Sequence, residues 1–165
     1  MKKIYNKIKM RTAIFPGTFD PFTLGHASII KRGLFLFDRI IIAVGVNGSK
    51  QTMFSMDQRI EQIKACYTHE PRIEVRSYEG MTVDFARQEH AGFILRGVRS
   101  LGDFEYERLL SDVNRKISKI DTVFLFTEPE YSSIQSNVVR ELLKYNQDIK
   151  DFVPIEIIEL LKKMI

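Results

Sequence analysis

The run Ile40-Ile41-Ile42-Ala43-Val44 constrains the fold more than any other part of the sequence. A half-buried strand alternates apolar and polar side chains, whereas this run is apolar at every position. Such runs are typical of central strands in parallel sheets, which helices cover on both faces. The sequence therefore predicts a buried parallel strand over Arg39–Val46.

Short apolar runs alternate with helical patterns along the rest of the chain, and this alternation favours a parallel α/β sheet. The predicted strands are Thr12–Phe15, Arg39–Val46, Ile73–Ser77, Gly92–Leu95 and Thr122–Phe126. The predicted helices are Gly25–Phe37, Ser55–Tyr67, Thr82–His90, Asp103–Ile117, Asn137–Tyr145 and Pro154–Met164. We therefore expect an α/β fold with a five-stranded parallel sheet and helices on both faces.

Charge is distributed unevenly along the 165 residues, which hold 25 Lys and Arg against 21 Asp and Glu, a net charge of +4. Residues 1–9 contain four lysines and no acidic residue, so the charges of residues 10–165 balance. We expect a basic N-terminal extension over residues 1–9 and a single domain over residues 10–165, a length that fits one domain. A balanced body argues against nucleic-acid binding, which needs a basic surface.

The single cysteine, Cys66, excludes an intramolecular disulfide and a cysteine-based zinc site, as is usual in a reducing compartment. The longest strongly apolar stretch, Gly33–Val46, is interrupted by Asp38 and Arg39 and is too short to span a bilayer. Residues 1–9 lack the apolar core of a secretory signal. The sequence thus predicts a cytoplasmic protein without a membrane partner.

Polar or glycine-containing segments follow every predicted strand. They are Gly17–Pro21, Asn47–Lys50, Glu79–Thr82, Arg96–Arg99 and Glu128–Ser133. In open parallel sheets, ligands bind outside the carboxyl ends of the strands. Turn formation explains the glycines and prolines, but it does not explain why Lys50, Arg96 and Arg99 share one edge. We therefore expect a nucleotide or phosphoester site there.

The segment after the first strand carries the residues best suited to phosphate chemistry. The chain has neither the dinucleotide fingerprint nor the P-loop pattern. Instead Thr18 follows the strand and Gly25-His26 opens the next helix. Gly25 allows a ligand to approach the backbone, and a helix N-terminus favours an anion. His26 can donate a hydrogen bond to that anion, although a histidine satisfied locally at a helix start is the competing interpretation.

Several motifs in order carry a resemblance to a known family. Thr23-Leu24-Gly25-His26 after Gly17-Thr18-Phe19-Asp20-Pro21 is similar to the T/H-x-G-H signature of the nucleotidyltransferase superfamily. Arg96-Gly97-Val98-Arg99, Asp103-Phe104-Glu105-Tyr106-Glu107 and Tyr131-Ser132-Ser133-Ile134-x-Ser136 follow. Together they resemble the bacterial phosphopantetheine adenylyltransferase family over about residues 11–160. The resemblance implies a Rossmann-like nucleotidyltransferase fold. It also implies transfer of the adenylyl group of ATP to 4′-phosphopantetheine, which gives dephospho-coenzyme A and pyrophosphate in coenzyme A biosynthesis.

The resemblance also implies a set of site residues. The expected catalytic residues are His26, Thr18, Lys50 and Arg99. The expected ATP contacts are Thr18, Phe19, His26, Gly97, Val98, Arg99, Glu107, Tyr131, Ser132, Ser133, Ile134, Gln135, Ser136 and Asn137. The expected phosphopantetheine contacts are Thr18, Lys50, Thr82 and Arg96. Mg²⁺ is expected to bind through the substrate phosphates, with no protein metal ligand. The family further implies a homohexamer and coenzyme A as a feedback ligand.

Alternatives to these roles stay open. Lys50 can be an ordinary solvated lysine, and Arg96 and Arg99 can pair with Asp103 and Glu107 in a surface network. The chain can instead be another small-phosphoester nucleotidyltransferase, for example one that uses nicotinate mononucleotide, or a non-catalytic nucleotide-sensing domain.

The sequence departs from the family pattern at two positions. Gln135 and Asn137 stand where the family has Ser and Thr or Ser, which puts those two side-chain contacts in question. We expect Asn137 to cap the following helix and the activity to be retained.

Overall fold

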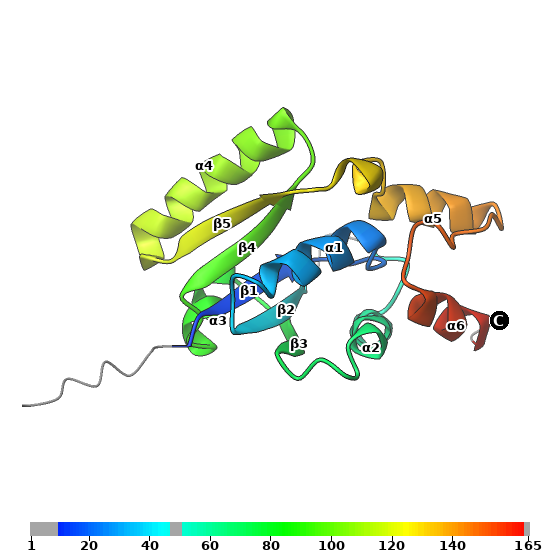
Figure 1. Ribbon diagram of the computed structural model, residues 1–165, viewed down its shortest axis with the longest axis horizontal. Helices are drawn as coiled ribbons and strands as arrows, with labels where there is room; N and C mark the ends of the chain where they lie inside the picture. The colour runs from blue at the N-terminus through cyan, green and yellow to red at the C-terminus, as the bar shows by residue number, and fades with distance from the viewer. Residues whose placement is uncertain (1–9, 47–50, 164–165) are drawn as a thin grey trace, which may run out of the picture.

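A computed structural model describes residues 10–46 and 51–163. Its strands are β1 (Thr12–Gly17), β2 (Arg39–Gly45), β3 (Ile73–Tyr78), β4 (Phe93–Val98) and β5 (Asp121–Phe126). They form one parallel sheet in the order β3-β2-β1-β4-β5 (Figure 1). The helices are α1 (Leu24–Gly33), α2 (Met56–Cys66), α3 (Thr82–Gln88), α4 (Leu101–Ser118), α5 (Ser136–Lys144) and α6 (Ile155–Lys163), with a 3₁₀ helix η1 (Pro129–Tyr131). The predicted fold class is confirmed.

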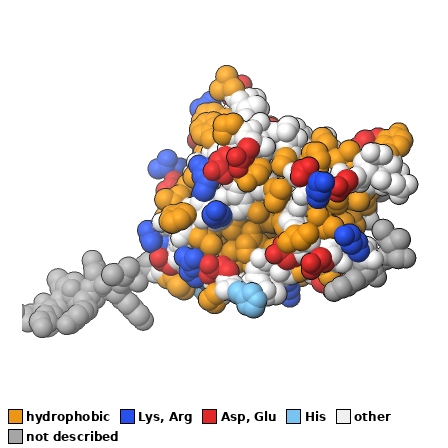
Figure 2. All heavy atoms as spheres, turned by 45° about the vertical axis from the view of Figure 1, so that its right-hand side comes forward, with side chains coloured by type: hydrophobic (Ala, Val, Ile, Leu, Met, Phe, Trp, Pro, Cys, Tyr) orange, Lys and Arg blue, Asp and Glu red, His pale blue; other side chains and the backbone are white. Residues whose placement is uncertain are grey.

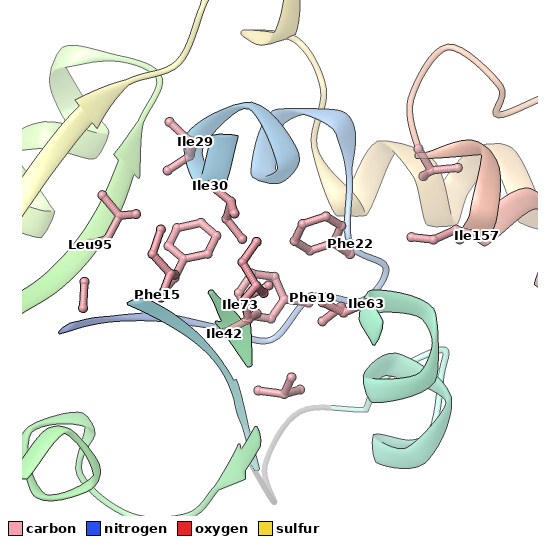
Figure 3. Packing of buried hydrophobic residues seen from close by; sticks show 14 of the residues in the cluster. Phe15, Phe19, Phe22, Ile29, Ile30, Ile42, Ile63, Ile73, Leu95 and Ile157 are labelled. Atoms are coloured by element: carbon pink, nitrogen blue, oxygen red, sulfur yellow. The ribbon is translucent and has the colours of Figure 1, made fainter. Parts of the chain in front are cut away.

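The apolar run of β2 is buried on both faces of the sheet, as its pattern predicts. Ile40, Ile41 and Ile42 have no exposed surface. Because side chains alternate along a strand, Ile40 and Ile42 join a core under α1, α2, α5 and α6, drawn in Figure 3. Ile41 joins a second cluster with residues of α3. The sheet is therefore the middle layer of three.

The strand order reverses direction next to β1. The chain runs outward from β1 through β2 to β3, returns across the sheet to β4 beside β1, and continues to β5. Such a reversal opens a crevice at the carboxyl ends of the two adjacent strands, where ligands of doubly wound sheets bind. The crevice in this protein lies between the end of β1 and the end of β4.

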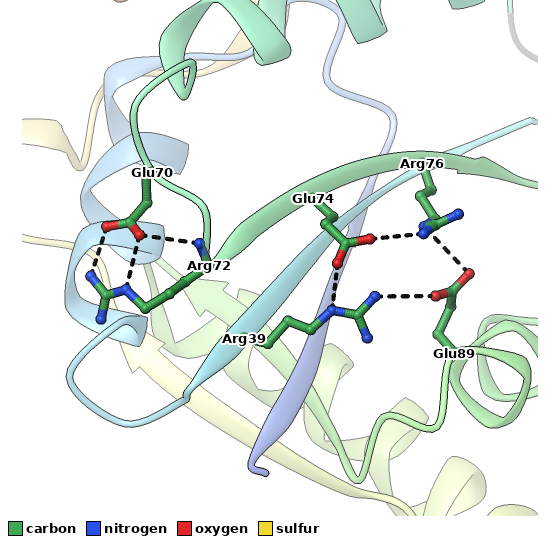
Figure 4. A network of polar contacts seen from close by, with 6 residues as sticks. All are labelled: Arg39, Glu70, Arg72, Glu74, Arg76 and Glu89. Carbon is green, nitrogen blue, oxygen red and sulfur yellow. Dashed lines mark hydrogen bonds and ion pairs between the residues drawn. The ribbon is translucent and has the colours of Figure 1, made fainter.

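The outer strand β3 carries charged side chains that protect an exposed sheet edge. Glu74 lies between Arg39 and Arg76, and Glu89 faces both arginines (Figure 4). The hydrogen bond from Arg39, followed by that from Arg76, lowers the pKa of Glu74 to about 2. The network is distant from the β1–β4 crevice and stabilises the edge of the sheet.

Several predicted boundaries are wrong: β1 ends at Gly17 rather than Phe15, α3 ends at Gln88 rather than His90, and three further ends differ. Helix α1 ends at Gly33 rather than Phe37, because the chain turns there and returns the ring of Phe37 against Phe93. Strand β4 continues to Val98, which pairs with Phe126 of β5, so Arg96 and Gly97 belong to the strand and not to a loop after it. Helix α4 begins at Leu101, two residues before the predicted start.

Two predictions fall outside the described residues. The basic extension, residues 1–9, is not described, so the division at residue 10 stays a prediction. Lys50 lies in the segment 47–50, which is not described either. Within residues 10–46 and 51–163, no helix is long and apolar enough to cross a membrane. Burial raises the pKa of the Cys66 thiol to about 12, so this cysteine is protonated at neutral pH.

Candidate active site

A cavity of about 390 Å³ lies at the β1–β4 crevice. The ends of β1 and β4 form its floor, and α1, α4 and α5 form its walls. The residues that line it are Phe15, Pro16, Gly17, Phe19, Thr23, Gly25, His26, Ile29, Arg96, Gly97, Arg99, Asp103, Tyr106, Glu107, Thr127, Ile134, Gln135, Ser136, Asn137 and Arg140. Most of the predicted site residues therefore meet at one place.

The first turn of α1 fixes His26 through a capping box. The hydroxyl of Thr23 accepts a hydrogen bond from the backbone N–H of His26 at 3.4 Å. In return, His26 Nδ1 accepts a hydrogen bond from the backbone N–H of Thr23 at 3.1 Å. The rings of Phe19 and Phe22 lie 5.1 and 5.4 Å from the imidazole, measured between centroids. The histidine is thus held on both sides.

This geometry determines the charge and tautomer of His26. Desolvation by the surrounding rings, with Arg99 and Arg96 nearby, lowers its pKa to about 4. The imidazole is neutral at pH 7, and Nδ1 is the acceptor, so the proton is on Nε2. His26 lines the cavity and can offer a neutral N–H donor to a phosphate. The competing interpretation, a histidine satisfied at the helix start, describes only its Nδ1 side.

Thr18 and Phe19 form a tight bend after β1. Phe19 has a φ of 52°, in the left-handed region, and its ring is 3% exposed. A side chain at Gly17 would meet that ring at 2.7 Å, so glycine is required there. Phe19 is therefore a core residue that also lines the cavity. Thr18 lines two adjoining cavities and not the central one.

Arg96 extends from β4 into the cavity and is already paired. Its Nε donates to Glu107 Oε2 at 2.8 Å, its Nη2 donates to the other carboxylate oxygen, and its Nη1 donates to the carbonyl of Pro16 at 2.7 Å. Three of the five N–H groups of the guanidinium are used in these contacts. Glu107 thus fixes the orientation of Arg96, and two N–H groups have no partner within the described residues.

Arg99 is paired in a similar but looser way. Its Nε donates to Asp103 Oδ2 at 2.9 Å, one helical turn along α4, and both side chains are about a third exposed. The network of Arg96 and Arg99 with Glu107 and Asp103, kept open above as an alternative, therefore exists. It lies inside the cavity rather than on a remote surface.

The start of α5 forms the wall opposite the arginines. Gln135 is the N-cap of this helix and its side chain makes no capping hydrogen bond. The prediction that Asn137 caps the helix is wrong, because the helix begins at Ser136 and Asn137 is already inside it. The hydroxyl of Ser136 donates to the carbonyl of Pro21 at 2.8 Å, which ties α5 to the loop after β1. The free backbone N–H groups of this first turn favour an anion.

Several predicted site residues lie outside the central cavity. Val98 is fully buried, so its side chain is not available to a ligand. Tyr131, Ser132 and Ser133 do not line the cavity, although the carbonyl of Tyr131 lies near Gly25. Thr82 bonds Tyr78 through the two hydroxyls at 3.0 Å and lines two adjoining cavities.

Sequence reasoning missed Arg140, which lines both the central cavity and the adjoining one beside Thr18. Its position one turn after Ser136-Asn137 was the available signal, because residues i and i+4 share a helix face. Thr23, Tyr106 and Thr127 also line the cavity without having been predicted to. Together with Arg96 and Arg99, Arg140 gives the cavity three guanidinium groups and a neutral imidazole, which suits a polyphosphate.

No group of three or more His, Cys, Asp or Glu residues in residues 10–46 and 51–163 has the arrangement of a metal site. The carboxylates of the cavity, Asp103 and Glu107, are each engaged by an arginine. A divalent cation that enters with its own phosphate ligands fits this cavity better than one held by protein oxygens.

Comparison with known proteins agrees with this chemistry. The sequence model of the cytidylyltransferase-like family matches residues 14–142, so the chain is a nucleotidyltransferase of that class. A phosphopantetheine adenylyltransferase of Bacteroides fragilis is 53% identical over 88% of this chain and 97% of its own. Those of Flavobacterium johnsoniae and Nautilia profundicola are 50% and 48% identical, over 88% and 89% of this chain and 95% and 96% of theirs. The chain belongs to the phosphopantetheine adenylyltransferase family.

Proposed function

We propose that this chain transfers the adenylyl group of ATP to 4′-phosphopantetheine, giving dephospho-coenzyme A and pyrophosphate in coenzyme A biosynthesis. One observation carries the proposal most directly. His26, Arg96 and Arg99 line one cavity at the strand-order reversal. Relatives of about 50% identity are named phosphopantetheine adenylyltransferase, which supports ATP and phosphopantetheine as the substrates.

The reaction needs positioning and charge stabilisation rather than a base. A phosphate oxygen of phosphopantetheine forms a bond to the α-phosphorus of ATP, and the bond from that phosphorus to the bridging oxygen of pyrophosphate breaks. The attacking phosphate is already an anion at neutral pH, so no proton has to be removed first. His26 would donate its Nε2–H to an α-phosphate oxygen, where negative charge develops. Arg99 and Arg140 would hold the β- and γ-phosphates, and Arg96 and Thr18 the attacking phosphate.

The pantetheine arm is proposed to occupy two adjoining cavities. One of about 680 Å³ and one of about 90 Å³ both contain Pro16, Thr82 and Arg96 in their walls. A phosphate at Arg96 would therefore leave the arm running toward Thr82 between β4 and α4. Lys50 stays a predicted phosphate contact from the segment that is not described.

Mg²⁺ is proposed to enter with ATP and to neutralise charge on the phosphates during transfer. Both carboxylates that line the cavity, Asp103 and Glu107, are paired with arginines. The chain's contribution is then to hold the phosphate oxygens that the cation does not use.

Pyrophosphate release in the presence of ATP, Mg²⁺ and 4′-phosphopantetheine tests this function. We expect release together with dephospho-coenzyme A, identified by mass spectrometry. Reaction with nicotinate mononucleotide but not with phosphopantetheine would transfer the assignment to another nucleotidyltransferase. ATP binding without either reaction would favour a nucleotide-sensing domain.

We also propose that the chain assembles as a homohexamer, as the family resemblance implies. Helix α4 has no buried residue. Its exposed apolar side chains include Leu101, Tyr106, Leu109 and Val113, and Phe126 of the adjacent β5 is 61% exposed. Figure 2 shows one face of the molecule, on which hydrophobic side chains lie exposed among charged ones. Contiguous exposed apolar surface of this kind favours association.

Light scattering gives the mass of the assembly directly. Wild-type protein should have six times the mass of one chain, and the pair of changes Leu109→Glu and Val113→Glu should reduce it. A monomeric wild-type protein at micromolar concentration would refute the hexamer.

Coenzyme A is proposed as a feedback ligand, because it contains both the pantetheine and the adenylyl groups that this site would bind. Competition between coenzyme A and either substrate in the pyrophosphate assay tests this. A cytoplasmic location is proposed on the substrates and on the single cysteine, and localisation of a tagged chain in its own cells tests it.

A further inference from the structure

Asp20 is a buried carboxylate whose surroundings the proposed reaction does not explain. It is 4% exposed and lies two residues after Thr18. Buried acidic side chains are rare unless they are paired, and this one does not cap α1, because Thr23 does. Its contacts come from two distant parts of the chain, the segment before α2 and helix α5.

The carboxylate of Asp20 holds the backbone that precedes α2. Its Oδ2 accepts the N–H of Met53 and its Oδ1 accepts the N–H of Phe54, both at 2.9 Å. These residues lie at the end of the connection from β2 to α2. Asp20 therefore joins the loop after β1 to the segment before α2 through two hydrogen bonds to its charged carboxylate. Hydrogen bonds to a charged group are the stronger ones in proteins.

Two guanidinium groups fix the same loop from opposite sides. Arg59 of α2 is 4% exposed and donates its Nη1 to the carbonyl of Thr18 at 2.6 Å. Arg140 of α5 donates its Nη1 to the carbonyl of Asp20 at 2.6 Å, and that nitrogen is 3.7 Å from the Asp20 carboxylate. We call Asp20, Arg59 and Arg140 the Asp20 cluster.

The loop that this cluster holds has a backbone that needs support. Phe19, between Thr18 and Asp20, has a φ of 52°, a conformation that persists in a residue other than glycine only when its surroundings enforce it. The Phe19 ring packs on the imidazole of His26. A shift of this loop would therefore move Thr18 and His26 together.

We propose that Asp20 is a positioning residue for adenylyl transfer. It holds Thr18 and the backbone at Met53–Phe54 in the positions that the reaction requires. It does not act as a base, since both of its oxygens are used and the attacking phosphate needs none. This role presupposes the adenylyl transfer proposed above. Since a displacement of about 1 Å can cost about 10²-fold in rate, the effect belongs in kcat rather than in the affinity for ATP.

Asp20→Asn is the test, because asparagine keeps the shape but has one acceptor oxygen and no charge. Asp38→Asn is the matched control. Asp38 also accepts a backbone N–H, from Arg11 at 2.8 Å, and an arginine side chain, but at the opposite end of β1. Both variants remove one charge and one acceptor oxygen.

We expect Asp20→Asn to lower kcat about 10- to 100-fold with KM for ATP within about threefold, and Asp38→Asn to leave kcat unchanged. Hydrogen exchange of the Met53 and Phe54 amides should accelerate at least about tenfold in Asp20→Asn only. A kcat within twofold of wild type overturns the role. So does a loss of kcat that matches a loss of folded protein by circular dichroism.

The turnover of the wild-type enzyme is measured in the same series. If the wild type shows no turnover, the proposed reaction is refuted. Amide exchange reports separately whether Asp20 holds the loop in place. If Asp20→Asn does not fold, Arg59→Lys decides. It keeps the charge but loses the planar group that holds the Thr18 carbonyl. A kcat at least threefold below wild type supports the role of the cluster, and an unchanged kcat overturns it.

Discussion

The two sides of the active-site cavity are built on different principles. On the buried side, Thr23 and His26 are held by the hydrogen bonds of the capping box and by aromatic packing. On the charged side, Arg96 and Arg99 are held by ion pairs with carboxylates of α4. His26 therefore faces the ligand as a neutral donor. The contacts of Arg96 and Arg99 are ion pairs between partly exposed side chains.

This difference divides the work of binding and catalysis. A donor that is locked before the ligand arrives costs nothing to orient during the reaction, which is the condition for stabilising a transition state. The arginines keep unused N–H groups for phosphate oxygens, but Glu107 and Asp103 compete for the same positive charge. We infer that the buried side contributes most to the rate and the charged side most to binding.

The ion pairs of the charged side also depend on helix α4, which buries no residue within a single chain. Both carboxylates belong to α4, which has no buried residue and presents exposed apolar side chains such as Leu109 and Val113. Helix α1, by contrast, buries Ile29 and Ile30 in the core. Association through α4 would therefore stabilise the ion pairs that orient Arg96 and Arg99.

Removal of the locked donor should have the largest effect. His26→Ala should lower kcat at least about 10²-fold, the scale of losing one preorganised electrostatic donor. KM for ATP should change much less, because the arginines remain. Steady-state pyrophosphate release gives both constants.

The exposed His69 supplies the matched control, since His69→Ala makes the same change away from the cavity. It should leave both constants unchanged. A near-normal rate for His26→Ala would remove the buried side from the chemistry.

Breaking the charged side should cost less and act on binding. Arg96→Gln should lower kcat/KM for phosphopantetheine about 10- to 100-fold, the loss of a charged hydrogen bond worth about 1.5–3 kcal/mol. It should also destabilise the protein, because Glu107, 15% exposed, would be left without its partner.

The double change Arg96→Gln with Glu107→Gln separates the two effects. A neutral pair should recover thermal stability, measured as Tm, without recovering kcat/KM. Recovery of activity in the double variant would mean that Arg96 serves the fold and not the phosphate.

The sequence predicted the framework well because burial leaves a periodic signal. The uninterrupted apolar run of β2 predicted a strand covered on both faces, and Ile40, Ile41 and Ile42 are fully buried. The strand-end position of the ligand site followed from the parallel topology alone. Element ends were less accurate, since Val98 extends β4 only through its pairing with Phe126.

The details of the site were less predictable because they arise from contacts distant in sequence. Asp20 accepts hydrogen bonds from residues 33 and 34 positions later, and Arg140 reaches back 120 positions. No periodicity reports such contacts. The sequence suggested the Arg96–Glu107 pair only as part of a surface network, as the alternative to phosphate binding. In the structure the pair lies inside the cavity.

The wall formed by α5 should tolerate change better than either side. Gln135→Ser with Asn137→Thr should change kcat and KM for ATP by no more than about threefold, because backbone N–H groups of this turn can hold a phosphate whatever the side chain. Serine at the N-cap should also stabilise α5, by about 0.5–1 kcal/mol, which a rise in Tm would report. A gain of several orders of magnitude in kcat would mean that the native wall is defective.

The smallest effect is expected from pH on the buried side. His26 has its pKa lowered to about 4 by burial and by the nearby arginines, so it is neutral from pH 5 upward and should show no titration between pH 5 and 8. Because the unfolded chain binds a proton at His26 near pH 6.5 and the folded chain does not, His26 should reduce stability as pH falls from about 6.5 toward 4. NMR of the imidazole nitrogens in the free enzyme measures the pKa and the Nε2–H tautomer together. A titration midpoint near pH 6.5 for His26 would show that its imidazole is as solvated as the arginine side. The proposed difference between the two sides would then be refuted.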